Sequence, residues 1–155
     1  MIAAEDNQVE TVKEILDAGR GTCVARFDAY IGAAAISIAP YHRLEMAALL
    51  ASSCSAFNIG SALVKAVESQ QLEMARIFAA KANQDMVGRA IVNAASTREL
   101  LAAELLMRSC NPELFPDILV RSVKNGIVGL IKLLVNKVDT QALDSALRLA
   151  SDMEI

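Results

Sequence analysis

Apolar residues recur along this chain with a constant 28-residue period. Four segments of the form Leu/Val-x-x-Ala/Ile-x-x-Leu/Phe begin at this spacing, at Leu44, Leu72, Leu100 and Val128. A fifth, looser copy begins at Val9, 35 residues before Leu44. Apolar residues three or four positions apart line one face of a helix, so each segment predicts an amphipathic helix. A period of roughly 20 to 50 residues is typical of stacked repeats, whose units bury a face only against their neighbours.

A second apolar segment lies ahead of the helices at Leu72, Leu100 and Val128 and recurs after the last of them, and it predicts the other half of a helical hairpin. It is present at residues 63–67, 91–95, 119–123 and 143–147. The last apolar residue of this first helix lies five residues before the second helix, as Val67 precedes Leu72. The residues between them are polar and suit a turn, and Gly126 suits a helix end. Since no alternating run predicts a strand, we expect an all-α fold.

The connections between hairpins share a pattern of their own. An apolar residue followed by Gly or Pro recurs at residues 59–60, 87–88 and 115–116. These positions divide the chain into repeats, because Pro is tolerated in the first helical turn and Gly in a connection. We expect one repeat domain over residues 1–155, with units of about 1–30, 31–58, 59–86, 87–114 and 115–139 and a final helix at 140–155.

Several second-helix segments resemble ankyrin repeats. Residues 7–19 (NQVETVKEILDAG) and 126–137 (GIVGLIKLLVNK) are the better matches, and 44–50 and 72–78 are fainter ones. The resemblance extends over nearly the whole chain but only over its helical part. The Thr-Pro-Leu-His motif is missing, and the short period leaves too little chain for a β-hairpin finger. The resemblance implies an all-α α-solenoid of about five helix-turn-helix ankyrin-like repeats plus a terminal helix. A HEAT-like or unclassified helical-hairpin array is the alternative.

The composition and the net charge exclude several classes of protein. Of the 155 residues, 54% are hydrophobic and 21% charged, which excludes a disordered chain. The net charge of -3 argues against a general polyanion binder, although a local basic stripe is compatible with it. No run approaches the ~20 apolar residues of a membrane span, and the N-terminus lacks the features of a signal peptide. The first unit has only a stub, residues 3–5, as its first helix, so we expect trimmed domain boundaries or a removed leader.

The three cysteines are expected to be reduced. Cys54 and Cys110 lie 56 residues, two periods, apart. With helix layers about 8–10 Å apart, this places them roughly 16–20 Å apart, beyond the ~7 Å reach of a disulfide. Cys23 could pair with Cys54 only if the first connection folded back. Reduced cysteines favour a cytoplasmic protein, and a protein secreted and translocated into a host cell's cytoplasm or nucleus would have the same sequence features.

Residues that carry chemistry are scarce. His42 is the only histidine, and no CxxC or HxxxH spacing would bring it together with Cys23 or Cys54 as a metal site. Gly19 and Gly21 flank an arginine, but no strand precedes them and no Gly-Lys-Ser/Thr follows, so a helix end is the better interpretation. We expect no catalytic residues, no metal, no cofactor and no enzyme activity.

Repeat proteins bind partners through the residues that vary at equivalent positions. One such series on the first helices runs through Lys65, Asn93 and Arg121. A second series of equivalent positions on the first helices includes Lys124, and Arg148 lies near the end of this series. In an ankyrin-like stack these helices line the concave face, which predicts a basic surface in the C-terminal half. An ordinary solvated face is the alternative interpretation.

The first connection is about seven residues longer than the period and brings Phe27, Tyr30 and Arg26 together. Aromatic residues and arginine are enriched in binding hot spots. These positions are therefore further candidates for partner binding. The alternative, which we favour, is that Phe27 and Tyr30 fill a wider first interface.

These patterns favour a non-catalytic protein–protein interaction module. It would bind a protein with an acidic segment on its concave first-helix face. A pathogen effector acting in host cells and an intracellular adaptor subunit of a larger assembly are equally compatible settings. A nucleic-acid-binding helical repeat is the alternative of a different class, against which the acidic total and the lack of stacking aromatics count. An enzyme subunit with its chemistry elsewhere is a third.

Overall fold

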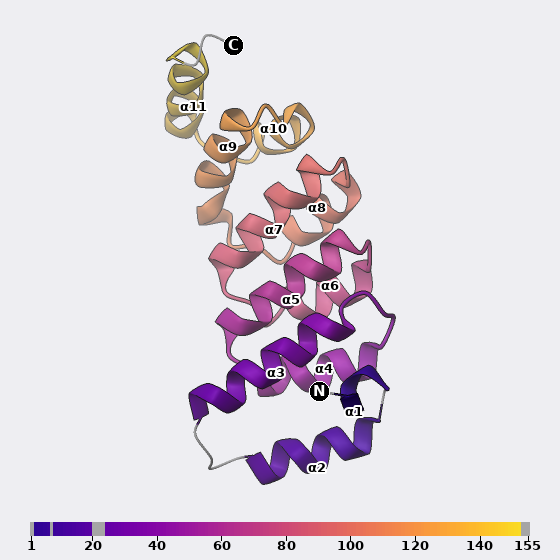
Figure 1. The fold of residues 1–155 in the computed structure, drawn as a ribbon. Helices are drawn as coiled ribbons and strands as arrows, with labels where there is room; N and C mark the ends of the chain where they lie inside the picture. Colours follow the sequence, from indigo (N-terminus) through magenta and orange to yellow (C-terminus); the bar gives the residue numbers. More distant parts are fainter. Residues whose placement is uncertain (1, 7, 20–23, 153–155) are drawn as a thin grey trace. The chain divides into compact units, whose positions relative to one another are not determined.

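The computed structural model describes residues 2–6, 8–19 and 24–152, and Figure 1 shows the chain as a series of helices. Every regular segment in these ranges is helical, so the expectation of an all-α fold is confirmed for this part of the chain. Among these residues, none of the helices combines the length and the apolar character that a membrane span requires. Cys23, and with it the question of its pairing, lies outside the described residues.

The second helices begin where the 28-residue pattern predicts. They are α2 (Val9–Gly19), α4 (Leu44–Ser53), α6 (Leu72–Ala79), α8 (Leu100–Met107) and α10 (Val128–Leu134). The first helices are α1 (Ile2–Glu5), α3 (Val24–Ile38), α5 (Ala56–Glu68), α7 (Gln84–Ser96), α9 (Phe115–Lys124) and α11 (Thr140–Asp152). A 3-10 turn, η1 (Pro112–Leu114), leads into α9.

The helices form two compact units, residues 1–86 and 87–155. In the first unit, α3 and α4 form one hairpin and α5 and α6 form the next. The hairpins stack layer on layer, because α3 packs on α5 and α4 packs on α6 (Figure 1). Helix α2 continues the second-helix layer against α4, and the short α1 contacts α2 and α3.

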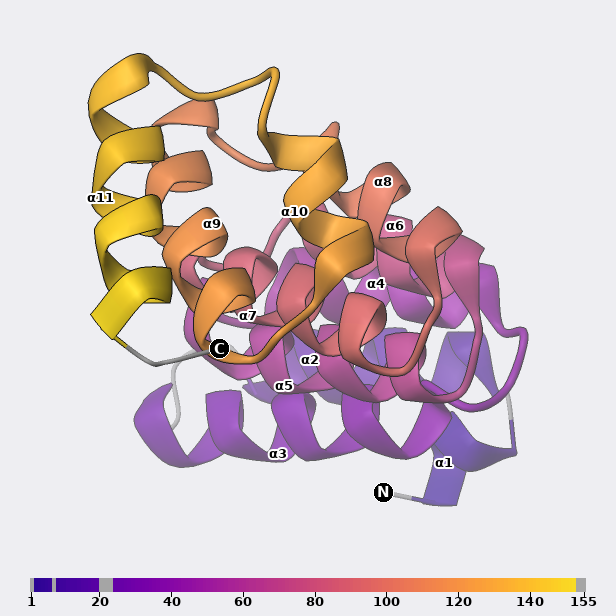
Figure 2. The same cartoon turned by 90° about the horizontal axis from the view of Figure 1, so that it is seen from above.

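In the second unit, α9 and α10 form a hairpin, and α10 also packs on α8. The last helix, α11, lies along α9 (Figure 2). It therefore takes the place of a first helix in a further hairpin, and the described chain ends before a second helix follows.

A polar N-cap recurs at 28-residue intervals, at the start of α5, of α7, of the turn η1 that leads into α9, and of α11. The side-chain oxygen of each cap accepts a hydrogen bond from a backbone N–H two or three residues later. Such a bond satisfies one of the free donors of the first turn and stabilises the helix by about 1 kcal/mol. The four caps are Ser55, Asn83, Asn111 and Asp139.

The turns inside the hairpins repeat as well. Gln70, Arg98 and Gly126, each one period apart, have φ values of 57°, 67° and 64°. In each turn the following N–H donates to a carbonyl near the end of the first helix, for example Glu99 to Ala94 at 2.9 Å. This left-handed helix end favours glycine, yet only the third turn has one.

The buried face of the second helices differs in one respect from the expected one. The pattern places Leu72 in the core, but Leu72 is only half-buried, and Met74 is buried instead together with Ala75 and Phe78. Leu72 opens α6 directly after the turn, so its side chain lies at the margin of the core rather than between helices.

Glycines permit close approach of neighbouring first helices in the first unit. A Cβ on Gly60 would lie 2.6 Å from Met86 Cγ, and one on Gly32 would lie 2.9 Å from Asn58 Cβ. A Cβ on Gly88, one period further, would lie an ordinary 3.6 Å from Ile118, so the close contact is confined to Gly32 and Gly60. Gly60 lies within α5, so the prediction that residues 59–60 belong to a connection is wrong.

Candidate functional site

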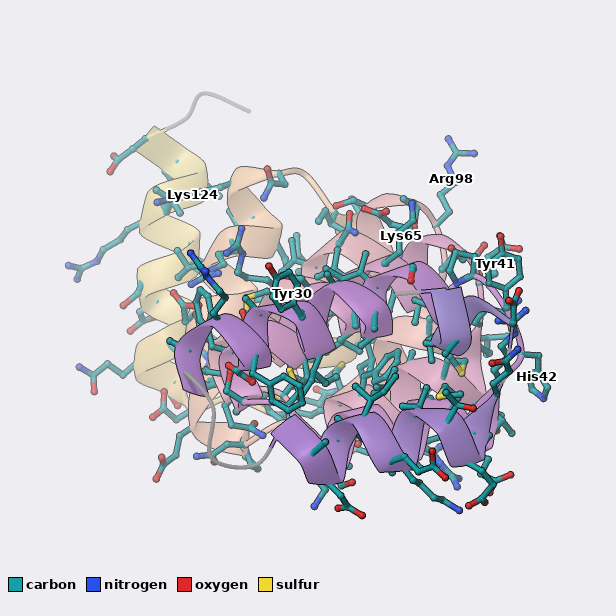
Figure 3. All side chains as sticks on the ribbon, turned by 60° about the horizontal axis from the view of Figure 1, so that its bottom comes forward. Tyr30, Tyr41, His42, Lys65, Arg98 and Lys124 are labelled. Atoms are coloured by element: carbon teal, nitrogen blue, oxygen red, sulfur yellow. The ribbon has the colours of Figure 1, made fainter. Side chains whose placement is uncertain are left out.

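Five of the seven predicted partner-binding residues are basic or amide side chains on the first helices of the two units. Lys65 is on α5 in the first unit, whereas Asn93 on α7, Arg121 and Lys124 on α9, and Arg148 on α11 belong to the second. Lys65, Lys124 and Arg148 are exposed, and Asn93 and Arg121 are half-buried. Lys65 and Lys124, in the last turns of their helices, are labelled in Figure 3. All five positions thus retain some contact with solvent.

Two of these cations have carboxylate neighbours on their own helices. Lys65 Nζ lies 3.5 Å from Glu68 Oε2, and Arg121 Nε lies 2.8 Å from Asp117 Oδ2. These pairs were not predicted from the sequence, although their spacings of three and four residues are typical of helical ion pairs. Exposed pairs contribute only about 0–1 kcal/mol, so an acidic partner can compete for both cations.

The two aromatic candidates have different surroundings. Phe27 is half-buried, and a Cβ built on Gly19 would collide with its ring. The ring therefore packs against the end of α2 and contributes to the fold of the first unit. Tyr30 is 61% exposed on α3 and is labelled in Figure 3. It is the member of this pair with a side chain available to a partner.

A polar cluster joins α3 to the start of α5. Asp28 accepts hydrogen bonds of 2.6 Å from Ser55 N and of 2.6 Å from Asn58 Nδ2. Burial raises the pKa of Asp28, but hydrogen bonds led by that from Ser55 outweigh this effect and hold the pKa below its ordinary value. These contacts join α3 to the start of α5, so the cluster has a structural role.

Burial raises the pKa of both described cysteine thiols. Cys54 and Cys110 are both free. Burial, and then the hydrogen bond and charge of Asp28, raise the pKa of Cys54 to about 12. Burial also raises the pKa of Cys110. Because the thiolate is the nucleophile, both side chains react slowly at neutral pH.

His42 lies exposed in the turn before α4 (Figure 3). Within residues 2–6, 8–19 and 24–152, no group of three or more His, Cys, Asp or Glu side chains could hold a metal ion. The neighbouring Arg43 has a structural role: its Nη1 donates to the carbonyl of Ala4 at 2.8 Å, and its guanidinium lies 5.1 Å from the Tyr41 ring.

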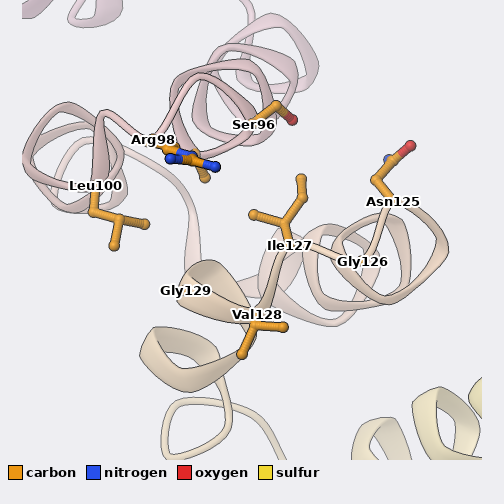
Figure 4. Close-up of a pocket in the computed structure, with 9 residues that line it drawn as sticks. Ser96, Arg98, Leu100, Asn125, Gly126, Ile127, Val128 and Gly129 are labelled. Carbon is orange, nitrogen blue, oxygen red and sulfur yellow. The ribbon is translucent and has the colours of Figure 1, made fainter.

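The second unit contains an open recess of about 470 Å³ between two equivalent turns. Figure 4 shows Ser96 and Arg98 of one turn on one side and Asn125 and Gly126 of the other turn across from them. The recess has one cation and few other polar groups, so its chemistry is not specific. Sequence reasoning missed it because it depends on the left-handed turn at Arg98.

A second depression in this unit is an apolar groove of about 320 Å³ between α9, α10 and α11. Leu119 and Val123 of α9 contribute to its lining. The α10 wall includes Val128 and Val135, and the α11 wall includes Leu147. Three of these side chains are substantially exposed: Val128 (59%), Val135 (38%) and Leu147 (65%). The apolar pattern includes Val128 and Leu147 of this lining but does not show that they are exposed, and it leaves out Val135.

Comparison of the chain with protein-family models, curated proteins and solved structures finds no match. The ankyrin resemblance therefore depends on the residues quoted above. What the chain does has to be argued from its own geometry.

Proposed function

We propose that the chain is a divergent ankyrin-like α-solenoid that acts as a non-catalytic protein–protein interaction module. A partner with an acidic segment would bind to the first helices, on the concave face of the stack. The observation that carries this proposal concerns positions that recur every 28 residues. Some of them keep the same structural role, and others differ in residue type. N-caps and turns recur with the period of the repeat, whereas the solvent-accessible positions 65, 93 and 121 hold Lys, Asn and Arg.

This combination is what a binding scaffold requires. The repeated caps and turns fix the direction of each first helix, and the positions between them can vary without loss of packing. Cations at Lys124 and Arg148 are exposed, so an acidic partner reaches them without desolvating the core. Electrostatic complementarity of this kind raises the association rate and selects among partners.

A nucleic-acid partner is less favoured by the same geometry. The net charge of the chain is -3, whereas binding to a phosphate backbone needs clustered positive charge. Tyr30, the exposed aromatic candidate, lies in the first unit, away from the basic positions of α9 and α11 in sequence. Strongly salt-dependent binding of a mixed-sequence RNA or DNA would favour this alternative.

The experiment that tests the proposal is site-specific photo-crosslinking in the cells from which the chain comes. A photoreactive phenylalanine analogue replaces Lys65, Asn93 or Lys124, one at a time. We expect the same partner protein to be cross-linked from Asn93 and Lys124, because both positions lie on first helices of one unit, and Lys65 tests the first helices of the other unit separately.

The matched controls are exposed glutamates of the second helices, Glu73 and Glu104, substituted in the same way. If the partner binds to the first helices, neither of these positions should be cross-linked to it. Equal cross-linking from first and second helices, or none from the first helices, would contradict the proposal.

A further inference from the structure

The turn between α7 and α8 has a charged residue in a conformation that favours glycine. Gln70, Arg98 and Gly126 are equivalent residues with a positive φ, which glycine adopts without strain. Gln70 has an interaction partner within the chain, whereas Gly126 has no side chain. Among the residues that the structure describes, the guanidinium of Arg98 has neither a hydrogen-bond partner nor an ion-pair partner. Arg98 therefore occupies an unfavourable conformation without adding a polar contact to the fold.

The strain at Arg98 points to a role for its side chain outside the turn. Backbone conformations that a residue type disfavours cluster at binding sites, where the role of the side chain outweighs their cost. Glycine at this position, as at Gly126, would relieve the strain, so the arginine does not serve the stability of the turn. Its side chain is exposed, and its charge is available to a ligand.

Arg98 contributes to the recess of about 470 Å³ that lies between two consecutive turns of the second unit. Figure 4 shows Arg98 and Leu100 on one side of it and Ile127 and Val128 on the other. A further hairpin added after α11 would stack beyond the turn at Gly126, so the recess is not the position of a following helix.

The other polar side chains of the recess already donate hydrogen bonds. Ser96 Oγ donates to the carbonyl of Val92 at 2.8 Å, and Asn125 Nδ2 donates to the carbonyl of Arg121 at 2.8 Å. None of the described residues that line the recess is acidic. Arg98 is thus the one charged group of this lining, and an anion meets no opposing carboxylate there.

An apolar surface lies beside this charge. Leu100 is 39% exposed and Val128 is 59% exposed, and both contribute to the lining. A ligand that places one carboxylate and one apolar group in the recess is complementary to it. The guanidinium of arginine binds a carboxylate through two parallel hydrogen bonds, which gives direction as well as affinity.

The recess also adjoins the basic surface of α9. Lys124 is exposed in the last turn of α9 and directly precedes Asn125, which lines the recess. An acidic segment that binds to Lys124 therefore lies next to Arg98's recess. A protein segment fits this arrangement better than an isolated small anion, because it can contact both cations and the apolar surface.

We infer that the recess binds an acidic side chain of the partner protein through Arg98, together with an apolar side chain two residues away against Leu100 and Val128. In an extended segment these two side chains point to the same side and are separated by about 7 Å. This inference deepens the proposed function and rests on it for the class of partner. It identifies Arg98 as a specificity-determining residue that lies outside the first helices.

The probe is the peptide acetyl-Ser-Glu-Ser-Leu-Ser-amide, titrated into the full chain and followed by amide NMR. We expect the backbone amides of Gly126, Ile127 and Gly129 to shift, with affinity in the millimolar range because a short peptide makes few contacts. Glutamine in place of the glutamate, or alanine in place of the leucine, should each weaken binding by about fivefold or more.

Variants at position 98 separate charge from backbone strain. Arg98→Gln keeps a long polar side chain in the same conformation and should weaken peptide binding by about tenfold. Arg98→Lys keeps the charge without the paired hydrogen bonds, so an intermediate loss is expected. Arg98→Gly should lose binding although it stabilises the fold, a result that a purely structural role would not give.

Arg108→Gln is the matched control, since Arg108 is an exposed arginine at the end of α8 and outside the lining of the recess. It should leave the affinity for the peptide unchanged. Circular dichroism checks that every variant is folded.

The outcomes distinguish this inference from the proposed function. Equal binding of the glutamate and glutamine peptides, unchanged affinity of Arg98→Gln, or no shift of the three amides at high millimolar peptide overturns the inference about the recess. Inorganic phosphate that shifts the same amides as strongly as the peptide also overturns it, because the recess then binds any anion. None of these results affects cross-linking from Asn93 and Lys124, which tests the first helices on their own.

Discussion

The carboxylate of Asp28 on α3 accepts a 2.6 Å hydrogen bond from the side-chain amide of Asn58 on α5. It also accepts one of 2.6 Å from the backbone N–H of Ser55, which is itself the N-cap of α5. One carboxylate therefore holds consecutive first helices together and fixes where the second of them begins. The contact explains why stability in the first unit should depend on a single half-buried acid.

We predict that Asp28→Ala lowers the free energy of unfolding by about 1–2 kcal/mol, through the lost hydrogen bonds. The pKa of Asp28 is lower in the folded than in the unfolded chain, so its contribution is present above the unfolded pKa and is lost as pH falls through the folded pKa. Urea unfolding should show a difference between wild type and variant at pH 7 that shrinks in acid. A difference independent of pH would contradict the role of the carboxylate.

Two leucines of α8 give a matched test of the helix faces. Leu106 is fully buried and Leu101 is 75% exposed. We predict that Leu106→Ala destabilises the chain by about 2–5 kcal/mol, since it leaves a cavity. Leu101→Ala should change stability by about 0.5 kcal/mol or less. Chemical denaturation measures both, and the reverse order would mean that the faces of α8 are assigned wrongly.

The left-handed turns predict a stabilising substitution. Arg98 has a φ of 67° where glycine is preferred, and it is exposed. Arg98→Gly should raise the free energy of unfolding by roughly 0.5–1 kcal/mol, because glycine adopts this conformation without strain. Gly126→Ala, at the equivalent position, should lower it by about 1 kcal/mol. If both substitutions shift the urea midpoint in the same direction, the turn is not the cause.

The thiols should be protected from alkylation. The pKa of Cys54 is about 12, so almost no thiolate is present at neutral pH. We predict that iodoacetamide modifies Cys54 at least about tenfold more slowly in the folded chain than in urea. Mass spectrometry of peptides gives the two rates. Recovery of a Cys54–Cys110 disulfide from native protein would contradict both the burial and the 28-residue register.

The helices were predictable because their signal is periodic. Each second helix begins at the residue that the apolar pattern marks, from Val9 to Val128. The N-caps share a register but not a residue type, with Ser55 and Asp139 in the same role, so the pattern is weak in one sequence. The left-handed turns at Gln70 and Arg98 could not be predicted from the sequence, because neither residue type favours a positive φ.

The candidate site was less predictable, since it depends on exposure and on neighbours. The sequence places Arg121 among the basic residues but does not show that Asp117 pairs with it at 2.8 Å. Phe27 is of a residue type that is enriched in binding hot spots. Only the position of its ring against Gly19 shows that it packs within the first unit. Leu147 fits the core pattern, and its exposure follows from the lack of a second helix after α11 among the described residues.

The most direct test of the proposed binding face is calorimetry of the cross-linked partner with the triple variant Arg121→Glu, Lys124→Glu, Arg148→Glu. The matched control is Arg76→Glu, Lys81→Glu, Arg108→Glu, which changes the net charge equally at exposed positions away from the first helices. We predict that the first variant, folded by circular dichroism, binds at least about tenfold more weakly, or 1.4 kcal/mol, with a smaller dependence on salt. The control should bind like wild type. Unchanged affinity of the folded first variant would contradict the claim that the first helices form the binding face.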